Sequence, residues 1–310
     1  MKMKKLISIL IAVFMLAAVA VPAFAADKTV TVTFSVSGGT APIMKHEMTV
    51  SAGTAAKYGF KTASADHNGV KIEGVTVFDV IAAANAELYG KAFSDKPTDY
   101  LVISSGFLTK AFSQSASSSG FIVNDIVPND GIYNPDYYGY TGYACDAARV
   151  ENGDDITFYF YRDTKYWSDN YVWFDSDIYT ADGGETVTVA LNGYCAAYYG
   201  INDLQTILDN YAAPMEGIGV YTVINGEKTL LGTTDAQGNA VISFPEAGEY
   251  VIFAEGNTPD ESPVITAYAD VTITEEQPAD EKPHTFIEWI RHILSVIKEW
   301  FSRLFSVFNG

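Results

Sequence analysis

TVTVTFSVS, residues Thr29–Ser37, alternates hydroxyl-bearing and apolar side chains, and Gly38 and Gly39 follow it directly. Successive side chains of a β-strand point to opposite faces, so this period of two predicts a strand. The glycine pair predicts a turn after it, and His46–Val50 is predicted as a second, shorter strand. The amino-terminal part is therefore expected to begin as a β-structure.

The period then changes from two to that of a helix. Thr76 can cap a helix and Gly90 can end it, with apolar residues at helical spacing between them, namely Val77, Val80, Ile81 and Ala84. Further strands are predicted at Asp99–Ser104, Gly120–Val123 and Ile156–Tyr161. This order of elements predicts an α+β domain over residues 26–178, with one helix packed across a mixed sheet.

Several short motifs of this domain resemble a known family. They are Gly74–Val80, Ser104–Leu108, Ser119–Asn124 and Asn152–Asp154, the last one before an aromatic strand. Together they are similar to the bacterial secreted relatives of the C-terminal domain of transcobalamin and intrinsic factor, over about Lys28–Asp177. The resemblance implies a β-grasp-like fold in a secreted or surface module. The large helical domain that holds cobalamin in the vertebrate proteins has no counterpart here, so cobamide binding does not follow from it.

This chain also departs from the family in two places. Ile132–Tyr143 reads as an inserted loop rich in Tyr and Gly, and Phe121 stands where a Trp is common.

Residues 179–274 have an all-β pattern, with turns at Asn225-Gly226 and Asp235–Gly238. The predicted strands are Thr186–Leu191, Gly219–Val223, Lys228–Leu231, Ala240–Phe244, Glu249–Ala254 and Ala269–Ile273. We expect a small sandwich, with a short helix at Asp203–Tyr211. Thr233–Ala240 and Gly248–Tyr250 resemble the Ig-like modules of bacterial surface proteins and the carboxypeptidase regulatory domain, which implies a spacing or supporting role.

The first 25 residues have the three parts of a secretory signal peptide. Lys2, Lys4 and Lys5 precede an apolar run from Leu6 to Val21, and Ala23-Phe24-Ala25 forms a small-x-small cleavage site. We therefore expect a secreted protein associated with the cell surface. Cleavage removes three of the 19 basic residues and none of the 38 acidic ones, which leaves a formal charge of −22. A chain this acidic is not expected to bind nucleic acid.

The carboxyl-terminal end, after an acidic linker at residues 275–284, is predicted to be an amphipathic helix over residues 285–310. Thr285 and Glu288 form a capping box, and one half of the helix is apolar. The contact residues on that half are Phe286, Trp289, Ile290, Ile293, Ile297, Trp300, Phe301, Leu304, Phe305 and Phe308. Charges recur too often for a membrane span. Three alternatives remain for what covers the apolar half: a membrane surface, a partner or second copy of the chain, or the protein's own domains.

No residue pattern indicates catalysis. The four histidines are scattered without a zinc spacing, and the Gly-x-Ser-x-Gly elbow, the P-loop and the dinucleotide fingerprint are not present. Acidic pairs such as Asp154-Asp155 are typical of solvated turns, and a glycosidase is the least favoured reading. We predict no enzyme, no metal site and no cofactor. Asp175, Asp177 and Asp182 leave loose calcium binding open, although the EF-hand spacing is not met.

The two cysteines, Cys145 and Cys195, lie in different predicted domains, so a disulfide between them is left open.

Aromatic residues are dense in the predicted turns, and Tyr and Trp offer flat apolar faces with a polar rim. The candidate ligand-binding residues are Tyr133, Tyr137, Tyr138, Tyr140, Tyr166, Trp167, Tyr171 and Trp173. The alternative is that these rings fill the core or pack over the sheet edge. The favoured function is a non-catalytic module that binds an extracellular glycan, small cofactor or protein. A structural scaffold whose tail is membrane-active or oligomerising is the alternative.

Ending the chain at Glu281 removes the predicted amphipathic helix and is expected to leave the domains folded. The truncated protein should lose liposome binding and move to the soluble fraction, because the apolar half-cylinder is gone. Flotation with vesicles measures this. Unchanged partitioning would favour docking within the molecule, and a smaller oligomer without any lipid effect would favour a partner helix.

Overall fold

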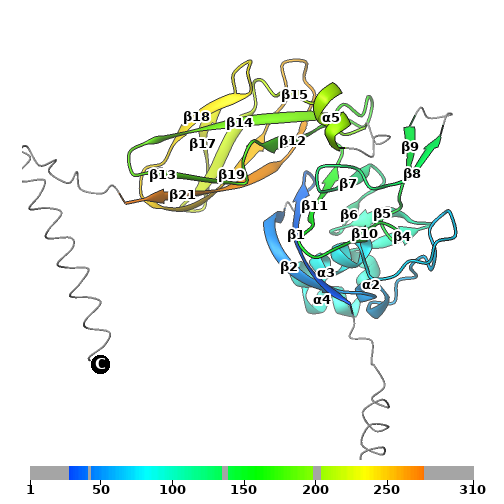
Figure 1. The fold of residues 1–310 in the computed structure, drawn as a ribbon. Helices are drawn as coiled ribbons and strands as arrows, with labels where there is room; N and C mark the ends of the chain where they lie inside the picture. The colour runs from blue at the N-terminus through cyan, green and yellow to red at the C-terminus, as the bar shows by residue number, and fades with distance from the viewer. Residues whose placement is uncertain (1–27, 41–42, 135–138, 198–203, 276–310) are drawn as a thin grey trace, which may run out of the picture.

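The computed structural model describes residues 28–40, 43–134, 139–197 and 204–275. The predicted signal peptide, the acidic linker after Glu275, the tail helix and both Tyr137 and Tyr138 lie outside these residues. Within these ranges, no helix combines the length and apolar character that crossing a membrane requires. The chain forms two domains that are predominantly β (Figure 1).

The first domain is built on a mixed four-stranded sheet in the order β2-β1-β11-β7. The alternating stretch forms β1 (Thr29–Ser37), which pairs antiparallel with β2 (Ile43–Ser51). On its other side β1 runs parallel to β11 (Asp155–Phe160), which pairs antiparallel with β7 (Ser119–Val123). These are strands that the sequence predicts, although only β1 was predicted from a period of two.

One helix packs on this sheet, as the sequence predicts. It is α3 (Val77–Tyr89), which Thr76 caps and Gly90 ends. Thr76 and Asp79 form a reciprocal capping box, and the Asp79 carboxylate also accepts a 2.9 Å hydrogen bond from the Ala55 N–H. The buried core of the domain lies between the sheet and this helix. Its largest fully buried side chains include Phe34, Phe78, Phe93, Phe112 and Phe158.

Short elements complete the domain. The helices are α2 (Thr54–Lys57), α4 (Lys91–Asp95) and the 3₁₀ turn η1 (Pro97–Asp99). The strands are β3 (Val75–Thr76), β4 (Val102–Ser104), β5 (Phe107–Ala111), β6 (Gln114–Ser115) and β10 (Arg149–Val150). The predicted strand at Asp99–Ser104 is thus shorter than expected, because Pro97 begins a 3₁₀ turn there.

The segment predicted as an inserted loop, Ile132–Tyr143, belongs instead to a hairpin. Its strands are β8 (Asn129–Asn134) and β9 (Gly139–Gly142), with Tyr133 opposite Tyr140. The sequence prediction did not consider a hairpin here.

The second domain is a sandwich of two five-stranded sheets. In one sheet the order is β15-β14-β12-β20 with β18 beside β14, and in the other it is β13-β21-β19-β16-β17. The strands of the first sheet are β12 (Asn170–Phe174), β14 (Thr186–Cys195), β15 (Ala213–Pro214), β18 (Asn239–Ser243) and β20 (Val264–Ile265). Those of the second are β13 (Ile178–Asp182), β16 (Gly219–Ile224), β17 (Glu227–Thr233), β19 (Gly248–Glu255) and β21 (Ala267–Thr274). A short helix, α5 (Leu204–Asn210), lies where one was predicted.

The sandwich begins earlier in the chain than residue 179, the boundary that the sequence predicted. Strand β12 pairs with β14 and β20, so residues 170–174 belong to the second domain. The sequence pattern did not reveal this because the partners of β12 follow it by about 20 residues (β14) and about 90 residues (β20), so neither pairing is local.

The two domains are joined by a buried contact as well as by the chain. Ile122 and Tyr159 of the first domain form one apolar cluster with residues of the second, namely Tyr171, Tyr194, Ala196, Ile207 and Ile265. The Tyr171 hydroxyl donates a 2.6 Å hydrogen bond to the Asp125 carboxylate, and the Tyr194 hydroxyl donates to the Asp125 carbonyl at 2.9 Å. Burial raises the pKa of Asp125 even though the Tyr171 hydrogen bond acts to lower it.

Further polar contacts cross the same boundary. The buried Ser37 hydroxyl oxygen accepts a 2.8 Å hydrogen bond from the Thr266 N–H. Lys45, which is paired with Asp155 of its own sheet at 2.8 Å, also lies 3.7 Å from Asp177 of the second domain. Arg162 donates to the carbonyls of Gly256 and Val264.

Replacing Tyr171 with Phe keeps the ring and removes the hydroxyl that binds Asp125. Because the half-buried Asp125 carboxylate loses this donor, the free energy of unfolding should fall by about 1–3 kcal/mol. Thermal and urea unfolding measure this. Tyr250→Phe is the matched control, because the Tyr250 hydroxyl donates to the carbonyl of Glu246 at an exposed position. Equal losses in the two variants would contradict the role given to Asp125.

Candidate functional site

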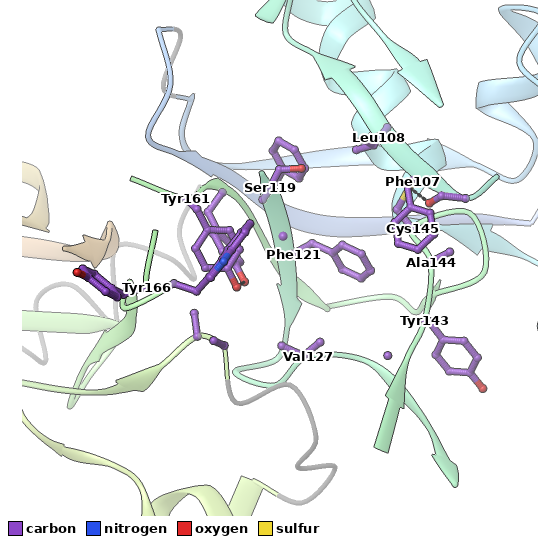
Figure 2. A pocket seen from close by; sticks show the side chains of 18 residues that line it. Phe107, Leu108, Ser119, Phe121, Val127, Tyr143, Ala144, Cys145, Tyr161 and Tyr166 are labelled. Atoms are coloured by element: carbon purple, nitrogen blue, oxygen red, sulfur yellow. Dashed lines mark hydrogen bonds between the residues drawn. The ribbon is translucent and has the colours of Figure 1, made fainter. Parts of the chain in front are cut away.

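A cleft of about 720 Å³ opens in the first domain next to its junction with the second (Figure 2). This volume lies within the range of small-ligand sites. Eight of its 18 lining residues are aromatic, namely Phe107, Phe121, Tyr143, Phe158, Tyr159, Tyr161, Tyr166 and Trp167. Among the residues that the structure describes, no Asp, Glu, Lys, Arg or His lines it. The cleft is therefore suited to an uncharged ligand with apolar surface.

Two walls face each other across the cleft. One, here called the β5 wall, consists of Phe107 and Leu108 of β5 with Tyr143 and Cys145, which follow the β8–β9 hairpin. Except for Phe107, these residues belong to or pack on the core of the first domain.

The other wall, here called the linker wall, consists of Tyr161, Tyr166, Trp167 and Ala196. In Figure 2, Tyr161 and Tyr166 lie on the opposite side of Phe121 from Phe107 and Cys145. Strand β7 thus runs between the walls, and its residues Ser119, Gly120 and Phe121 line the cleft.

The loop that carries the linker wall is held by two aspartates. The Asp163 carboxylate accepts hydrogen bonds from the Ser168 hydroxyl and from the N–H groups of Tyr166 and Lys165, and these lower its pKa to about 2. Asp169 is buried and accepts from the N–H groups of Arg162 and Asp163, at 2.8 and 2.9 Å. This loop is a connection between domains, yet its backbone is fixed by side chains on both ends.

Trp167 adopts an unusual backbone conformation in this loop. Its φ is 58°, in the left-handed region that bulky residues rarely occupy, at a typical cost of about 1–3 kcal/mol. Its ring packs edge-on against Tyr161 with centroids 4.7 Å apart, and its carbonyl accepts a hydrogen bond from the Cys195 thiol. The surrounding contacts therefore hold a strained residue with its ring in the cleft.

The large rings at the rim of the cleft are open to solvent. Phe107 is 73% exposed, Tyr166 is 71% exposed and Trp167 is 40% exposed. Rings on both walls thus remain available to cover a ligand.

The structure separates the residues that the sequence proposed for ligand binding. Tyr166 and Trp167 line the cleft. Tyr171 does not, because it is buried against the first domain and bonded to Asp125, and this corrects its expected role. Trp173 packs beside Tyr171 at the domain junction, with ring centroids 6.0 Å apart.

The remaining candidates lie on the β8–β9 hairpin. Tyr133 and Tyr140 are cross-strand partners there, and Tyr137 and Tyr138 lie outside the described residues. Sequence reasoning missed Phe107 and Phe121 as cleft residues. Phe107 carries one usable sequence signal, since a large aromatic residue directly follows the turn dipeptide Ser105-Gly106. Both residues of this dipeptide have a positive φ in the structure.

Both cysteines are free thiols in the structure, so the disulfide that the sequence left open is not formed. Cys145 is buried in the β5 wall and donates to the Gly106 carbonyl, and burial raises the pKa of its thiol. A thiol with a raised pKa is a poor nucleophile at neutral pH.

The aspartates considered for calcium have protein partners. Asp175 accepts hydrogen bonds from the Tyr179 hydroxyl and the Ala190 N–H, and Asp177 lies beside Lys45. Across the ranges that the structure describes, no group of three or more His, Cys, Asp or Glu side chains is arranged to hold a metal ion.

Comparison with known proteins gives no family assignment. No protein-family model and no curated protein matches the chain. Among solved structures, it is similar to the fibronectin(III)-like modules of Clostridium thermocellum CbhA, with 14% identity over 59% of this chain and 87% of that chain and a TM-score of 0.24. A second is the N-terminal four Ig domains of Dscam1 isoform 6.9, with 11% identity over 52% of this chain and 39% of that chain and a TM-score of 0.19. At these scores the description of the sandwich rests on its own strand pairing.

Replacing Gly120 with Ala tests how closely the floor of the cleft is packed. A Cβ at this position would overlap the Tyr159 hydroxyl and lie 2.5 Å from its Cζ atom, and Tyr159 is buried. The variant should lose about 1–3 kcal/mol of stability in urea unfolding, as overpacked sites do. Gly142→Ala serves as control, because the nearest atom to its Cβ is 3.8 Å away. If the two variants are equally stable, the floor is looser than described.

Proposed function

We propose that this protein is a secreted, non-catalytic binding module that takes an uncharged extracellular ligand in the aromatic cleft of its first domain. The sandwich holds that domain away from the cell, and the amphipathic tail associates with a membrane or protein surface. The observation that carries the proposal is Trp167, held in a left-handed backbone conformation with its ring at the cleft. Strained residues of this kind persist where the surrounding structure enforces them and cluster at ligand sites.

The free energy of burying the exposed rings also supports a binding function. Phe107 and Tyr166 leave most of their surface in water, and burying a large apolar side chain is worth roughly 1.5–3 kcal/mol. Because the linker-wall loop is already ordered by Asp163 and Asp169, a ligand would not bear the full entropy of fixing it.

The chemistry of the cleft argues for binding rather than catalysis. General acid–base catalysis requires a titratable group within reach of the substrate, and the described part of the lining contains no carboxylate or imidazole. The one thiol in the lining, Cys145, is buried and has a raised pKa.

The fold of the first domain supports the resemblance found in the sequence. The strand order β2-β1-β11-β7, with β11 parallel to β1 and α3 packed on the sheet, is what a β-grasp-like domain would have, and it supports this part of the proposal. We include in the proposal that this domain is related to the secreted transcobalamin-type modules and that the sandwich is an Ig-like module. Cobamide binding is not part of it.

The alternative is a structural scaffold in which both domains are spacers and the tail anchors or perturbs membranes. The hydrogen bonds of Tyr171, Tyr194 and Ser37 across the domain junction favour it, because they stiffen the pair of domains.

Trp167→Ala in the full mature chain tests the binding function. The chain is screened against neutral glycans, cobamides, peptides and host surface proteins, and a saturable ligand is then titrated. We expect the variant to weaken binding at least about tenfold, since one large ring is worth at least 1.4 kcal/mol, with little change in melting temperature. Val241→Ala, at an exposed apolar position of the sandwich, is the control and should bind as the parent does. No saturable ligand, or a Trp167 variant that merely unfolds, would favour the scaffold.

A further inference from the structure

Strand β7 is an edge strand of the first-domain sheet. It pairs with β11 on one side, and no described strand lies on its other side apart from the single bridge between Val123 and Ile126. An open edge presents N–H and C=O groups that can pair with another chain.

The register of β7 shows which groups point outward. The Tyr161 N–H donates to the Ser118 carbonyl at 3.0 Å, and the Asn124 N–H donates to the Asp155 carbonyl at 2.9 Å. Antiparallel pairs exchange hydrogen bonds at every second residue, so the even-numbered positions of β7 face β11. The N–H and C=O of Ser119 and Phe121 therefore point away from the sheet, and both residues line the cleft.

The cleft extends around this edge, so residues on both faces of β7 line it or lie next to it. Phe121 packs with the core of the first domain, on the side of the β5 wall. On the other face, Tyr159 lies against Gly120 and Ile122 belongs with Tyr159 to the junction cluster, on the side of the linker wall. In Figure 2 the strand stands between the two groups of rings.

We propose that the ligand is an extended segment of polypeptide that adds to β7 as a fifth strand. Side chains of a strand alternate between its faces, so successive residues of the added segment would meet the β5 wall and the linker wall in turn. This inference rests on the proposed function and specifies the chemistry of its ligand.

A polypeptide fits the hydrogen bonding of the cleft better than a sugar does. Sugar hydroxyls buried here would need polar side chains, but three of the five hydroxyl groups in the described lining already bond within the protein. The Ser119 hydroxyl donates to the Ala116 carbonyl, and the Tyr159 and Tyr161 hydroxyls bond each other. Unpaired buried hydroxyls lower affinity. The backbone of Ser119 and Phe121, in contrast, offers a donor and an acceptor at the two-residue spacing of a strand.

The charges of the cleft and of the whole chain indicate which residue types the bound segment would contain. The described lining residues carry no ionised side chain, which favours uncharged, apolar or aromatic residues within the cleft, since an unpaired buried charge is costly. The chain as a whole is strongly acidic, with 38 acidic and 19 basic residues, so basic residues flanking the segment would be attracted and acidic ones repelled.

The experiment titrates the full mature protein with three probes by calorimetry. The first is an eight-residue peptide of Val, Tyr and Phe with a lysine at each end, and the second is the same peptide N-methylated at every residue. The third is the neutral linear oligosaccharide cellohexaose. We expect the first peptide to bind and its methylated form to bind at least about tenfold more weakly, because it keeps the side chains and loses the N–H donors.

Two variants at one position separate the backbone from the ring. Phe121→Ala and Phe121→Pro both remove the ring, but only the proline removes the outward N–H. The N–H of residue 121 is not used toward β11, so the sheet should tolerate proline at this edge, which a thermal melt checks. Phe121→Pro should bind the first peptide at least about tenfold more weakly than Phe121→Ala.

Equal affinity of the two variants, or of the two peptides, would overturn strand addition. If cellohexaose binds in a Trp167-dependent way and the peptide does not, the proposed binding function stands and this inference fails. If neither the unmethylated peptide nor cellohexaose binds, the strand inference fails. The broader ligand screen with Trp167→Ala then decides the binding function separately. If Phe121→Pro melts early, the comparison of the two peptides decides alone.

Discussion

Strand β11 is buried on both faces, and the rest of the molecule is arranged around that constraint. Ile156, Phe158 and Phe160 point into the core beneath α3, whereas Tyr159 points into the cluster shared with the sandwich. A strand in a two-domain protein commonly has one solvated face. Here the second face is covered by the neighbouring domain, so the first sheet and the junction depend on the same six residues.

The cleft lies where the sandwich stops covering the sheet of the first domain. The sandwich protects the second face of β11 through Tyr171 and Tyr194 but does not extend over the outer edge of β7. The chain then crosses between domains in the loop after β11, and Asp163 and Asp169 fix this loop so that its aromatic rings lie next to the open edge. The domain junction, the strained backbone of Trp167 and the cleft thus all result from where the sandwich stops covering the first sheet.

Local signals predicted much of the fold. The alternation in β1, the Thr76 cap, the Gly90 terminus of α3 and the turn at Asn225-Gly226 each depend on residues a few positions apart, and each appears in the structure. The assignment of β12 to the sandwich depends on its pairing with β14 and β20, which follow it by about 20 and 90 residues, and no local pattern encodes that pairing. Tyr171 looked like Tyr166 in the sequence, since both are aromatic residues near a turn. Only the tertiary contact with Asp125 makes one of them buried and leaves the other at the surface.

The position of β21 has a mechanical consequence. It is the last described strand, and it lies inside its sheet with β13 parallel on one side and β19 antiparallel on the other. Tension applied to the chain beyond Thr274 would pull β21 along its own axis. All of its ladder hydrogen bonds would then be loaded together in shear, instead of opening one after another as in a peeled edge strand. A protein held by its carboxyl-terminal end would in this way resist force through the strand nearest its attachment.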